Sequence, residues 1–392
     1  MQENSAPDGF RWYSEGRVRF LAPIFPATEA GEPIAPTKIP VFYNPFSKPS
    51  RDMTVLLVAA FFNKRITAAE PLAGSGVRGI RLLKETENVE EAYLNDLNPS
   101  AYNVIKLNAE ANGVADKVVA SNQEASLFLA RHSEARYRFE YVDVDPVGAP
   151  VRFLENSIRA CGHLGVVGAS ATDLAALTGV KPRPCIRKYD AIPMHVAFSK
   201  EIAIRIMMGF VARAAARLNA GIEPLLSYYH RHFIRVFAQV KRGRSGALQS
   251  IQEIGWLTYC GSCMRIETTP LTELPDRLCR TCGSGNMVAG PLWVGRLSDN
   301  SLAGRMLERV GEDYDEARRA LSRIVSEDTS LVGYYPIPLL SRWARRSPPP
   351  PKAVIEELRN LGYRASQTHI DPNAVKTDAP PEDIKRVLST LP

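Results

Sequence analysis

Between residues 50 and 218, short apolar runs alternate with stretches whose apolar residues recur at helical spacing. This alternation is typical of βαβ units built on a parallel sheet. Asn98-Pro99 is a start signal for one intervening helix, and Asn112-Gly113 is a stop signal. The pattern therefore predicts an α/β domain over residues 50–243. Its parallel strands are expected at Ile66–Leu72, Ala92–Asp96, Lys117–Ser121, Phe139–Asp145 and Gly165–Ser170.

Strict alternation of polar and apolar residues marks further strands on both sides of these units. Residues 10–21 alternate around Glu15-Gly16, which predicts a hairpin. This hairpin belongs to an N-terminal extension, residues 1–49, that also holds a proline-rich stretch. Residues 223–240 alternate and are rich in Tyr, Phe, Ile and Val, so we expect late, antiparallel strands there.

A smaller α+β domain is expected over residues 244–392, after a shift in composition at Lys241-Arg242-Gly243-Arg244. It contains a helical stretch at residues 302–325 and four consecutive prolines at 348–351, which act as a stiff spacer. A helix, two short strands and a terminal helix then predict a winged-helix-like end at residues 352–392.

Four of the six cysteines form two CxxC pairs in the segment 255–291. Fifteen residues separate Cys260-x-x-Cys263 from Cys279-x-x-Cys282, a spacing typical of a four-cysteine zinc ribbon. Two pairs at this spacing argue against a redox dithiol. We therefore expect a structural Zn²⁺ bound by all four cysteines, because such a site leaves no position for a catalytic water.

The chain carries a formal net charge of +7 and has a pI near 9.1, which favours an anionic partner. No apolar run approaches the roughly 18 residues of a membrane span, and the N-terminus is polar. We expect a cytoplasmic protein without membrane attachment, and we infer no obligate protein partner. The basic candidates for phosphate contact are Lys181, Arg183, Arg187, Lys188, Lys241, Arg242, Arg244, Arg342, Arg345 and Arg346.

A glycine-bearing segment, residues 70–76, lies at the end of the first expected parallel strand and precedes a helix. Gly74 and Gly76 permit a tight turn and a close approach of the backbone to a ligand at the helix N-terminus. Asp96 ends the next strand, where an acid accepts hydrogen bonds from ribose hydroxyls. The alternative role for Asp96 is to cap the helix that follows. Gly79 completes a GxGxxG spacing, so the loop alone allows either a dinucleotide or S-adenosylmethionine.

The most informative segment is Asp145-Pro146, at the end of the fourth expected parallel strand. A carboxylate and a proline carbonyl are both acceptors, and together they suit an NH2 group on a planar ring. Asp145 would orient such an amine, stabilise its developing charge and could take its proton, with Asp143 tuning it from the same strand face. This favours methylation of a nucleobase amine such as guanine N2, and hence S-adenosylmethionine as cofactor. The alternative is a simple turn at a strand end.

Taken together, these motifs resemble the tRNA (guanine-26-N2)-dimethyltransferase family, in particular its archaeal members. The matching segments occur in the right order through nearly the whole chain. They are residues 40–45, 50–52, 73–81, 95–96, 143–146, 171–173, 185–189, 290–295, 368–369 and 376–377.

The resemblance implies a Rossmann-like class I methyltransferase domain and a C-terminal domain that helps to hold tRNA. The implied reaction is S-adenosylmethionine-dependent dimethylation of N2 of guanine 26. The catalytic aspartate of the family falls at Asp145, and an aromatic ring that packs on the target guanine falls at Phe42. The cofactor-binding positions of the family fall at Arg51, Arg78, Asp96, Glu124 and Ala125.

Two residues depart from the family pattern. Val147 stands where the family usually has a ring, which removes half of the expected aromatic sandwich around the guanine. Glu124 stands where the family often has Asp. Two alternatives therefore stay open: methylation of a different guanine, such as position 27, and a tRNA-binding protein with a weakened methyltransferase site.

Overall fold

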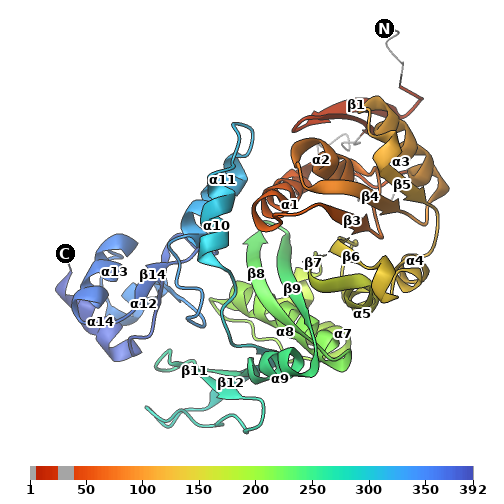
Figure 1. Ribbon diagram of the computed structural model, residues 1–392. Coiled ribbons are helices and arrows are strands. Elements are labelled where there is room, and N and C mark those ends of the chain that lie inside the picture. Colours follow the sequence, from red (N-terminus) through yellow and green to blue (C-terminus); the bar gives the residue numbers. More distant parts are fainter. Residues whose placement is uncertain (1–5, 25–38, 392) are drawn as a thin grey trace. The chain divides into compact units, whose positions relative to one another are not determined.

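The computed structural model describes residues 6–24 and 39–391 (Figure 1). The proline-rich stretch between the hairpin and residue 39 lies largely outside the described residues. By compactness the chain forms two units. Unit 1 comprises residues 1–169 and 305–318, and unit 2 comprises residues 170–304 and 319–392. The three-part organisation expected from composition, with boundaries at 49 and 243, stays a prediction.

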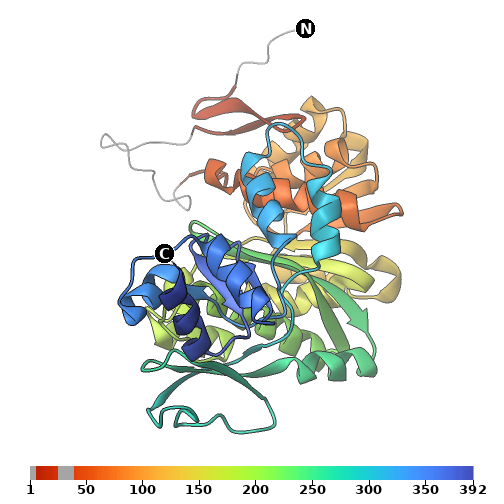
Figure 2. The same ribbon diagram turned by 90° about the vertical axis from the view of Figure 1, so that its left-hand side faces the viewer.

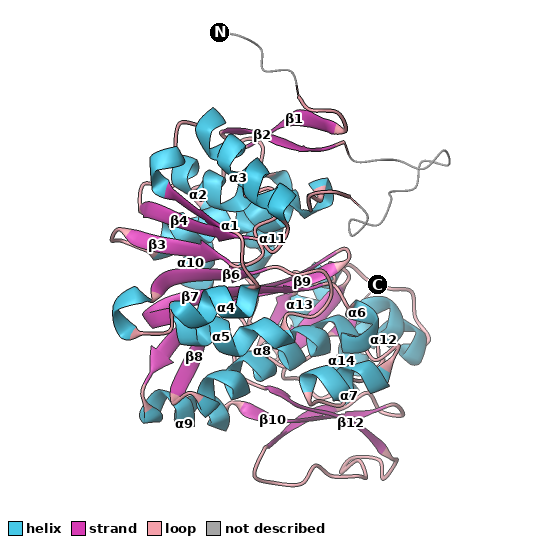
Figure 3. Ribbon diagram, turned by 90° about the vertical axis from the view of Figure 1, so that its right-hand side faces the viewer, coloured by secondary structure: helices cyan, strands magenta, loops and turns pink. Residues whose placement is uncertain are grey.

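Unit 1 is built on parallel strands in the order β5-β4-β3-β6-β7, of which β4, β3, β6 and β7 are labelled in Figure 3. The first strand in the chain thus lies at the centre, and the order reverses between β3 and β6, as in doubly wound α/β folds. The predicted α/β class and all five predicted parallel strands are confirmed. The strands are β3 (Ile66–Glu70), β4 (Val89–Asn95), β5 (Val118–Ser121), β6 (Phe139–Val144) and β7 (Cys161–Ala171).

The helices of unit 1 form two packed groups, α1 with α2 and α3, and α4 with α5. Helix α3 illustrates why the local sequence forms these elements. The side chain of Asn98 accepts a hydrogen bond from the Ser100 amide, Pro99 occupies the first turn, and Gly113 follows the last turn with a positive φ. The helices are α1 (Lys48–Phe61), α2 (Val77–Glu85), α3 (Pro99–Ala111), α4 (Ala125–Arg131) and α5 (Val151–Ala160). Short 3-10 turns are η2 (Pro45–Ser47), η3 (Ala115–Lys117) and η4 (Ala135–Tyr137).

The predicted N-terminal hairpin is present as β1 (Phe10–Glu15) and β2 (Val18–Pro23). Buried charges attach it to the helices. The guanidinium of Arg81 in α2 is fully buried and lies 2.7 Å from carboxylate oxygens of Glu15 and of Asp52, and 2.8 Å from Glu85. Because an unpaired buried charge is costly, these carboxylates and Arg81 stabilise the hairpin only as a set.

Unit 2 begins with three helices and an antiparallel strand pair, as expected for residues 223–240. A three-stranded sheet in the order β11-β10-β12 follows and carries the cysteines. These elements are α6 (Leu174–Leu177), α7 (Pro182–Tyr189), α8 (Ser199–Arg217), β8 (Ala220–His230), β9 (Phe233–Arg242), α9 (Arg244–Gln252), β10 (Ile254–Cys260), β11 (Ile266–Pro270) and β12 (Asn286–Trp293).

The helical stretch expected at residues 302–325 is not one helix. It is divided into α10 (Asn300–Leu307) and α11 (Asp315–Ile324) by a turn that contains Gly311. Glycine is the weakest helix former after proline, which explains the break.

The C-terminal end has the helix, strand, strand, helix order that the sequence predicted. A third, two-residue strand joins the sheet, in the order β13-β15-β14, and α12, α13 and α14 pack together (Figure 2, blue). The elements are β13 (Tyr335–Pro336), α12 (Ile337–Ala344), α13 (Pro351–Asn360), β14 (Ala365–Gln367), β15 (Ala374–Thr377) and α14 (Pro381–Thr390).

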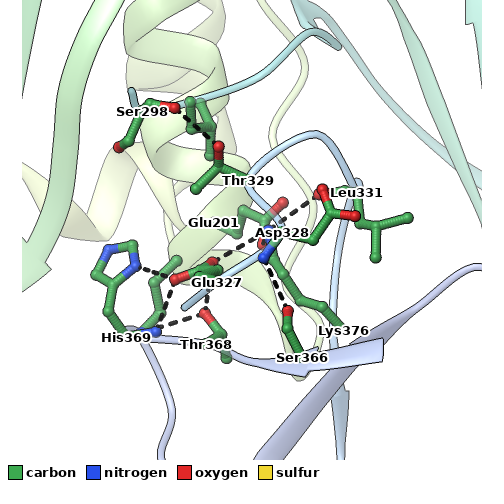
Figure 4. A network of polar contacts seen from close by, with 12 residues as sticks. Glu201, Ser298, Glu327, Asp328, Thr329, Leu331, Ser366, Thr368, His369 and Lys376 are labelled. Atoms are coloured by element: carbon green, nitrogen blue, oxygen red, sulfur yellow. Dashed lines mark hydrogen bonds and ion pairs between the residues drawn. The ribbon is translucent and has the colours of Figure 1, made fainter. Parts of the chain in front are cut away.

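A buried polar network joins this C-terminal sheet to α8 within unit 2 (Figure 4). Lys376 of β15 lies 3.1 Å from Glu201 of α8 and 3.3 Å from Glu327, and it donates a hydrogen bond to the Leu331 carbonyl. The side chains of Lys376, Glu201 and Glu327 are at most 1% exposed. The network therefore fixes how the C-terminal sheet packs on α8.

Candidate active site

The glycine loop connects β3 to α2 and needs glycine at both predicted positions. Gly74 and Gly76 have φ values of +55° and +74°, a region that side chains rarely adopt. A Cβ atom on Gly74 would lie 2.5 Å from the carbonyl oxygen of Phe42, so the loop that carries Phe42 packs directly on it. The loop leads straight into α2, whose N-terminal amides form a natural site for a polar or anionic ligand.

Asp96 follows β4 and holds the glycine loop. Its Oδ2 accepts a hydrogen bond from the Gly74 amide at 2.8 Å, and its Oδ1 accepts one from the Asn98 amide at 2.9 Å. The suggestion that Asp96 caps the next helix is wrong, because the side chain that caps α3 is that of Asn98. Each carboxylate oxygen has a second lone pair, so Asp96 can also accept hydrogen bonds from a ligand.

Glu124 and Ala125 lie at the carboxyl end of β5, the strand next to β4. The Glu124 carboxylate caps α4 by accepting hydrogen bonds from the amides of Ser126 and Leu127, at 2.6 and 3.0 Å. Ala125 begins the helix and is 4% exposed. The glycine loop follows β3, Asp96 follows β4 and Glu124 follows β5. All three thus lie at the carboxyl ends of neighbouring strands, where ligands of doubly wound folds bind.

Arg51 of α1 supports the loop that carries Phe42. Its Nε and Nη2 donate to the two carboxylate oxygens of Glu15, both at 2.7 Å, and its Nη1 and Nη2 donate to the Asn44 carbonyl at 3.2 Å. Burial by itself would raise the pKa of Glu15, but Arg51 and Arg81 outweigh burial and lower that pKa to about 2. Glu15 is an anchor that the sequence analysis missed. Its place at the hairpin turn was visible, but its arginine partners were not.

Asp145 and Arg78 form an ion pair at the end of β6. Arg78 Nη2 donates to the Asp145 carboxylate, and Nη1 of the same guanidinium donates to Asp143, which also accepts a hydrogen bond from the Tyr141 hydroxyl. Burial disfavours the charged form of Arg78. Asp143 and Asp145 nevertheless outweigh burial and raise the pKa of Arg78 well above its ordinary range. The sequence singled out Arg78 and Asp145 separately, and the fold brings them together.

The two residues expected beside a target base are both accessible. The Phe42 side chain is exposed by 37%, and Val147 is exposed by 56%. The Asn98 side chain donates to the Pro40 carbonyl at 2.6 Å, so the segment before Phe42 is tied to the same region as Asp96. Phe42, the glycine loop and Asp96 therefore form one connected group in unit 1.

The four predicted cysteine ligands converge within unit 2. Their sulfur atoms all lie within 4.8 Å of one another, a span that fits tetrahedral coordination of a single metal ion. Cys260 ends β10, and hydrogen bonds from the amides of Met264 and Gly283 to the carbonyls of Cys260 and Cys279 form the two expected turns. Cys185 lies outside this cluster, and burial and nearby Asp173 raise the pKa of its thiol to about 12.

The parallel sheet has the strand order of a doubly wound fold. Asp96 binds the glycine loop after β3, and Asp145-Pro146 follows the neighbouring strand β6. These features together define a Rossmann-like methyltransferase. The family model described as N2,N2-dimethylguanosine tRNA methyltransferase matches residues 16–389. The chain belongs to this family.

Within residues 6–24 and 39–391, no helix combines the length and the apolar character that a membrane span requires.

Individual relatives agree with this assignment. The chain is 34% identical to the tRNA (guanine(26)-N(2))-dimethyltransferase of Methanothermobacter thermautotrophicus, covering 96% of this chain and 98% of the relative. It is 31% identical to the tRNA (guanine(26)-N(2)/guanine(27)-N(2))-dimethyltransferase of Aquifex aeolicus, over 96% of this chain and 95% of the relative. Among solved structures it resembles Trm1 from Pyrococcus horikoshii in complex with S-adenosyl-L-methionine. The TM-score is 0.83 at 28% identity, over 96% of this chain and 99% of the other.

Proposed function

We propose that this chain transfers methyl groups from S-adenosylmethionine to N2 of guanine 26 in tRNA, and that it does so twice. The observation that carries the proposal is the Asp145 carboxylate, held by Arg78 at the end of β6, one strand away from the acid-held glycine loop. The family and the names of both relatives give the same substrate class.

The cofactor would lie along the carboxyl ends of β3, β4 and β5. Gly74 and Gly76 allow the tight turn of the loop through their positive φ values, and Asp96 would accept hydrogen bonds from the ribose hydroxyls. Glu124 and Ala125 would flank the adenine. Arg51 and Arg78 would approach the charged end of the molecule. Bound S-adenosylmethionine supplies an electrophilic methyl group, so the protein need only align the nucleophile with it.

Asp145 and Pro146 would act on the amine of the guanine. This amine is a poor nucleophile because its lone pair is delocalised into the ring. Acceptors directed at both amine hydrogens favour the pyramidal, positively charged transition state over the flat ground state. Asp145 supplies the charged acceptor and the Pro146 carbonyl the neutral one. Phe42 would pack against the extruded base.

Val147 bears on the number of methyl groups transferred. A second transfer requires a site that accepts the bulkier monomethylated amine. A valine fills less space than the ring found at this position in the family, so the substitution leaves room for that amine.

The four cysteines would bind one Zn²⁺ with a structural role. Their sulfur atoms converge from the end of β10, from the turn between β10 and β11, and from the segment between β11 and β12, so the metal would tie the sheet to its own long loop. Four thiolates complete the shell of the ion, and the metal would take no part in methyl transfer.

Contact with tRNA would involve the exposed basic residues of unit 2. Lys181, Arg183 and Arg187 are exposed on and beside α7, and Arg345 and Arg346 are exposed after α12. Two other candidates are partly neutralised, because Lys188 pairs with Asp173 and Lys241 pairs with Glu223. The enzyme would act on tRNA in the cytoplasm.

One alternative has a specific observation in its favour, since the name of the Aquifex relative includes guanine 27. Transfer of labelled methyl groups from S-adenosylmethionine to unmodified tRNA transcripts separates the possibilities. We expect incorporation into the normal transcript and into one with adenine at position 27, and none into one with adenine at position 26. If incorporation were lost in the transcript with adenine at position 27 and kept in the one with adenine at position 26, the target would be guanine 27. No incorporation into any transcript, with cofactor bound in calorimetry, would leave a tRNA-binding protein with a weakened site.

A further inference from the structure

Beyond Asp145 itself, three residues in unit 1 form a chain of buried polar contacts that ends on its carboxylate. The Tyr141 hydroxyl donates to Asp143, Asp143 accepts from Arg78, and Arg78 donates to Asp145. Tyr141 and Asp143 are at most 1% exposed and Arg78 is 5% exposed, whereas the Asp145 side chain is 25% exposed. The contacts therefore run from buried residues of β6 to the partly exposed Asp145 at the carboxyl end of this strand.

The spacing along β6 explains how this arrangement forms. Tyr141 and Asp143 share one face of β6, and Asp145 follows one residue past the end of the strand at the same two-residue spacing. Arg78 lies in the first turn of α2, directly after the glycine loop, and reaches across to that face. One planar guanidinium can therefore bridge both aspartates, a geometry that lysine cannot reproduce because it is a point charge.

We propose that Arg78 is a positioning residue for Asp145, fixed in place by Asp143 and Tyr141. Asp143 accepts from Nη1 and so neutralises and orients the guanidinium. Nη2 of the same guanidinium donates to the Asp145 carboxylate and keeps it in its ionised, accepting form. The role of Asp145 is then to orient the amine and stabilise its charge, and the amine proton passes to solvent water, which reaches the 25% exposed Asp145 side chain. This inference rests on the proposed function, since it concerns how the catalytic aspartate of that reaction is held.

The Nε–H group of Arg78 is a donor that the two aspartates do not use. Among the described residues, the buried Nε–H of Arg78 has no acceptor. A buried donor without an acceptor costs free energy, and an acceptor atom of a bound ligand would remove that cost. The protein loaded with S-adenosylmethionine is therefore the state in which the positioning role is to be measured.

The test uses variants that differ in how they disturb the contact chain. Asp143→Asn removes the charge that anchors Arg78, and Tyr141→Phe removes one hydroxyl while the ring stays. Neither residue belongs to the proposed cofactor or guanine contacts. Arg78→Met removes the bridge, and Arg78→Lys keeps a single charge. For each we would measure kcat and KM for tRNA, cofactor affinity, thermal stability and the pH dependence of single-turnover methyl transfer.

We expect Asp143→Asn to lower kcat at saturating S-adenosylmethionine about a hundredfold, the cost of a misplaced catalytic group, with tRNA KM little changed. Tyr141→Phe should lower kcat about tenfold, as the loss of one hydrogen bond to a charged group. Arg78→Lys should recover part of the activity lost in Arg78→Met.

The pH profile separates positioning from a merely structural role. Among the described residues, the charged and titratable groups that act most strongly on Arg78 are Asp143 and Tyr141 of β6, Asp145 after it, and Glu70 of β3. Without the cation, the Asp145 carboxylate takes up a proton at higher pH. We therefore expect the acidic limb of the Arg78→Met profile to move to higher pH than that of the wild type.

Folded Asp143→Asn and Arg78→Met proteins with wild-type kcat and an unmoved acidic limb would overturn this inference alone. A fall in activity that only follows the loss of folded protein, with the limb unmoved, would also overturn it. A wild-type protein that methylates no tRNA would overturn the proposed function, and this inference with it.

Discussion

The Gly74 amide donates a hydrogen bond to the Asp96 carboxylate at 2.8 Å, so the glycine loop and the end of β4 are held as one element. Asp96 therefore has two tasks, to hold the loop and to accept from the ribose. We predict that Asp96→Ala lowers the affinity for S-adenosylmethionine about a hundredfold, as expected for two lost hydrogen bonds to a charged group. Isothermal calorimetry checks this. Asp116→Ala, which removes an exposed acid after α3, is the matched control and should bind normally. Equal affinities for the two variants would contradict the assignment.

Asp145 is expected to act on the transition state and not on binding of the RNA. We predict that Asp145→Ala lowers single-turnover methyl transfer about a thousandfold, a loss typical of removing a preorganised charged group from an active site. Its affinity for tRNA, measured by filter binding, should stay close to that of the wild type. Near-normal turnover in this variant would remove Asp145 from the mechanism, and a loss of tRNA affinity alone would make it a binding residue.

Glu15 should contribute a pH-dependent part of the stability. Arg51 and Arg81 overcome burial and lower its pKa from 4.5 to about 2. A carboxylate with a lowered pKa stabilises the fold above its ordinary pKa and loses this contribution as the pH falls through its lowered value. We predict that Glu15→Gln lowers the free energy of unfolding by about 3 kcal/mol at pH 7, since it leaves two buried arginines without this partner.

The difference between Glu15→Gln and wild type should shrink as the pH falls from 4.5 toward 2. Denaturant unfolding across this pH range measures it. A difference that is constant over the whole range would show that Glu15 acts through packing and not through its charge.

Lys376 should be essential to the packing of the C-terminal sheet on α8. Its removal leaves Glu201 and Glu327 buried without the cation between them (Figure 4). We predict that Lys376→Met destabilises the protein by about 4 kcal/mol, and that adding Glu201→Gln restores part of the loss. Thermal unfolding and limited proteolysis check both statements. Lys352→Met, an exposed lysine in α13, is the control, and equal stability of the two single variants would contradict a buried role.

The cysteine cluster should bind one zinc ion per chain. We predict that elemental analysis finds this ratio in the wild type and that Cys279→Ser lowers it, with proteolysis between β10 and β12 increasing at the same time. Cys185→Ser is the control because this thiol lies outside the cluster, and it should keep the full zinc content. A folded, protease-resistant wild type without metal would contradict the structural role of zinc.

Local patterns were enough to predict the order of the elements and several residues of the site. Apolar runs placed β3 to β7, glycines marked the loop, and the CxxC spacing marked the cluster, because each signal lies within a few residues. The two-residue strand β13 gave no such signal, and the break between α10 and α11 rests on a weak one, Gly311.

The ion pairs could not be predicted in the same way. Arg78 meets Asp145 from 67 residues away, and Arg51 meets Glu15 from 36 residues away. No local period encodes such distances, since they depend on which strands become neighbours. For the pair of Arg78 and Asp145, the sequence offered only half of the signal, namely the position of Asp143 on the same strand face as Asp145.

Nucleoside mass spectrometry tests the central claim most directly. An unmodified tRNA transcript would be incubated with S-adenosylmethionine and either the wild-type protein or Asp145→Ala, then digested to nucleosides. Our account predicts N2,N2-dimethylguanosine after incubation with the wild type, and unmodified guanosine after incubation with the variant or with a transcript that has adenine at position 26. Methylation on another atom, or none with folded protein and bound cofactor, would contradict it.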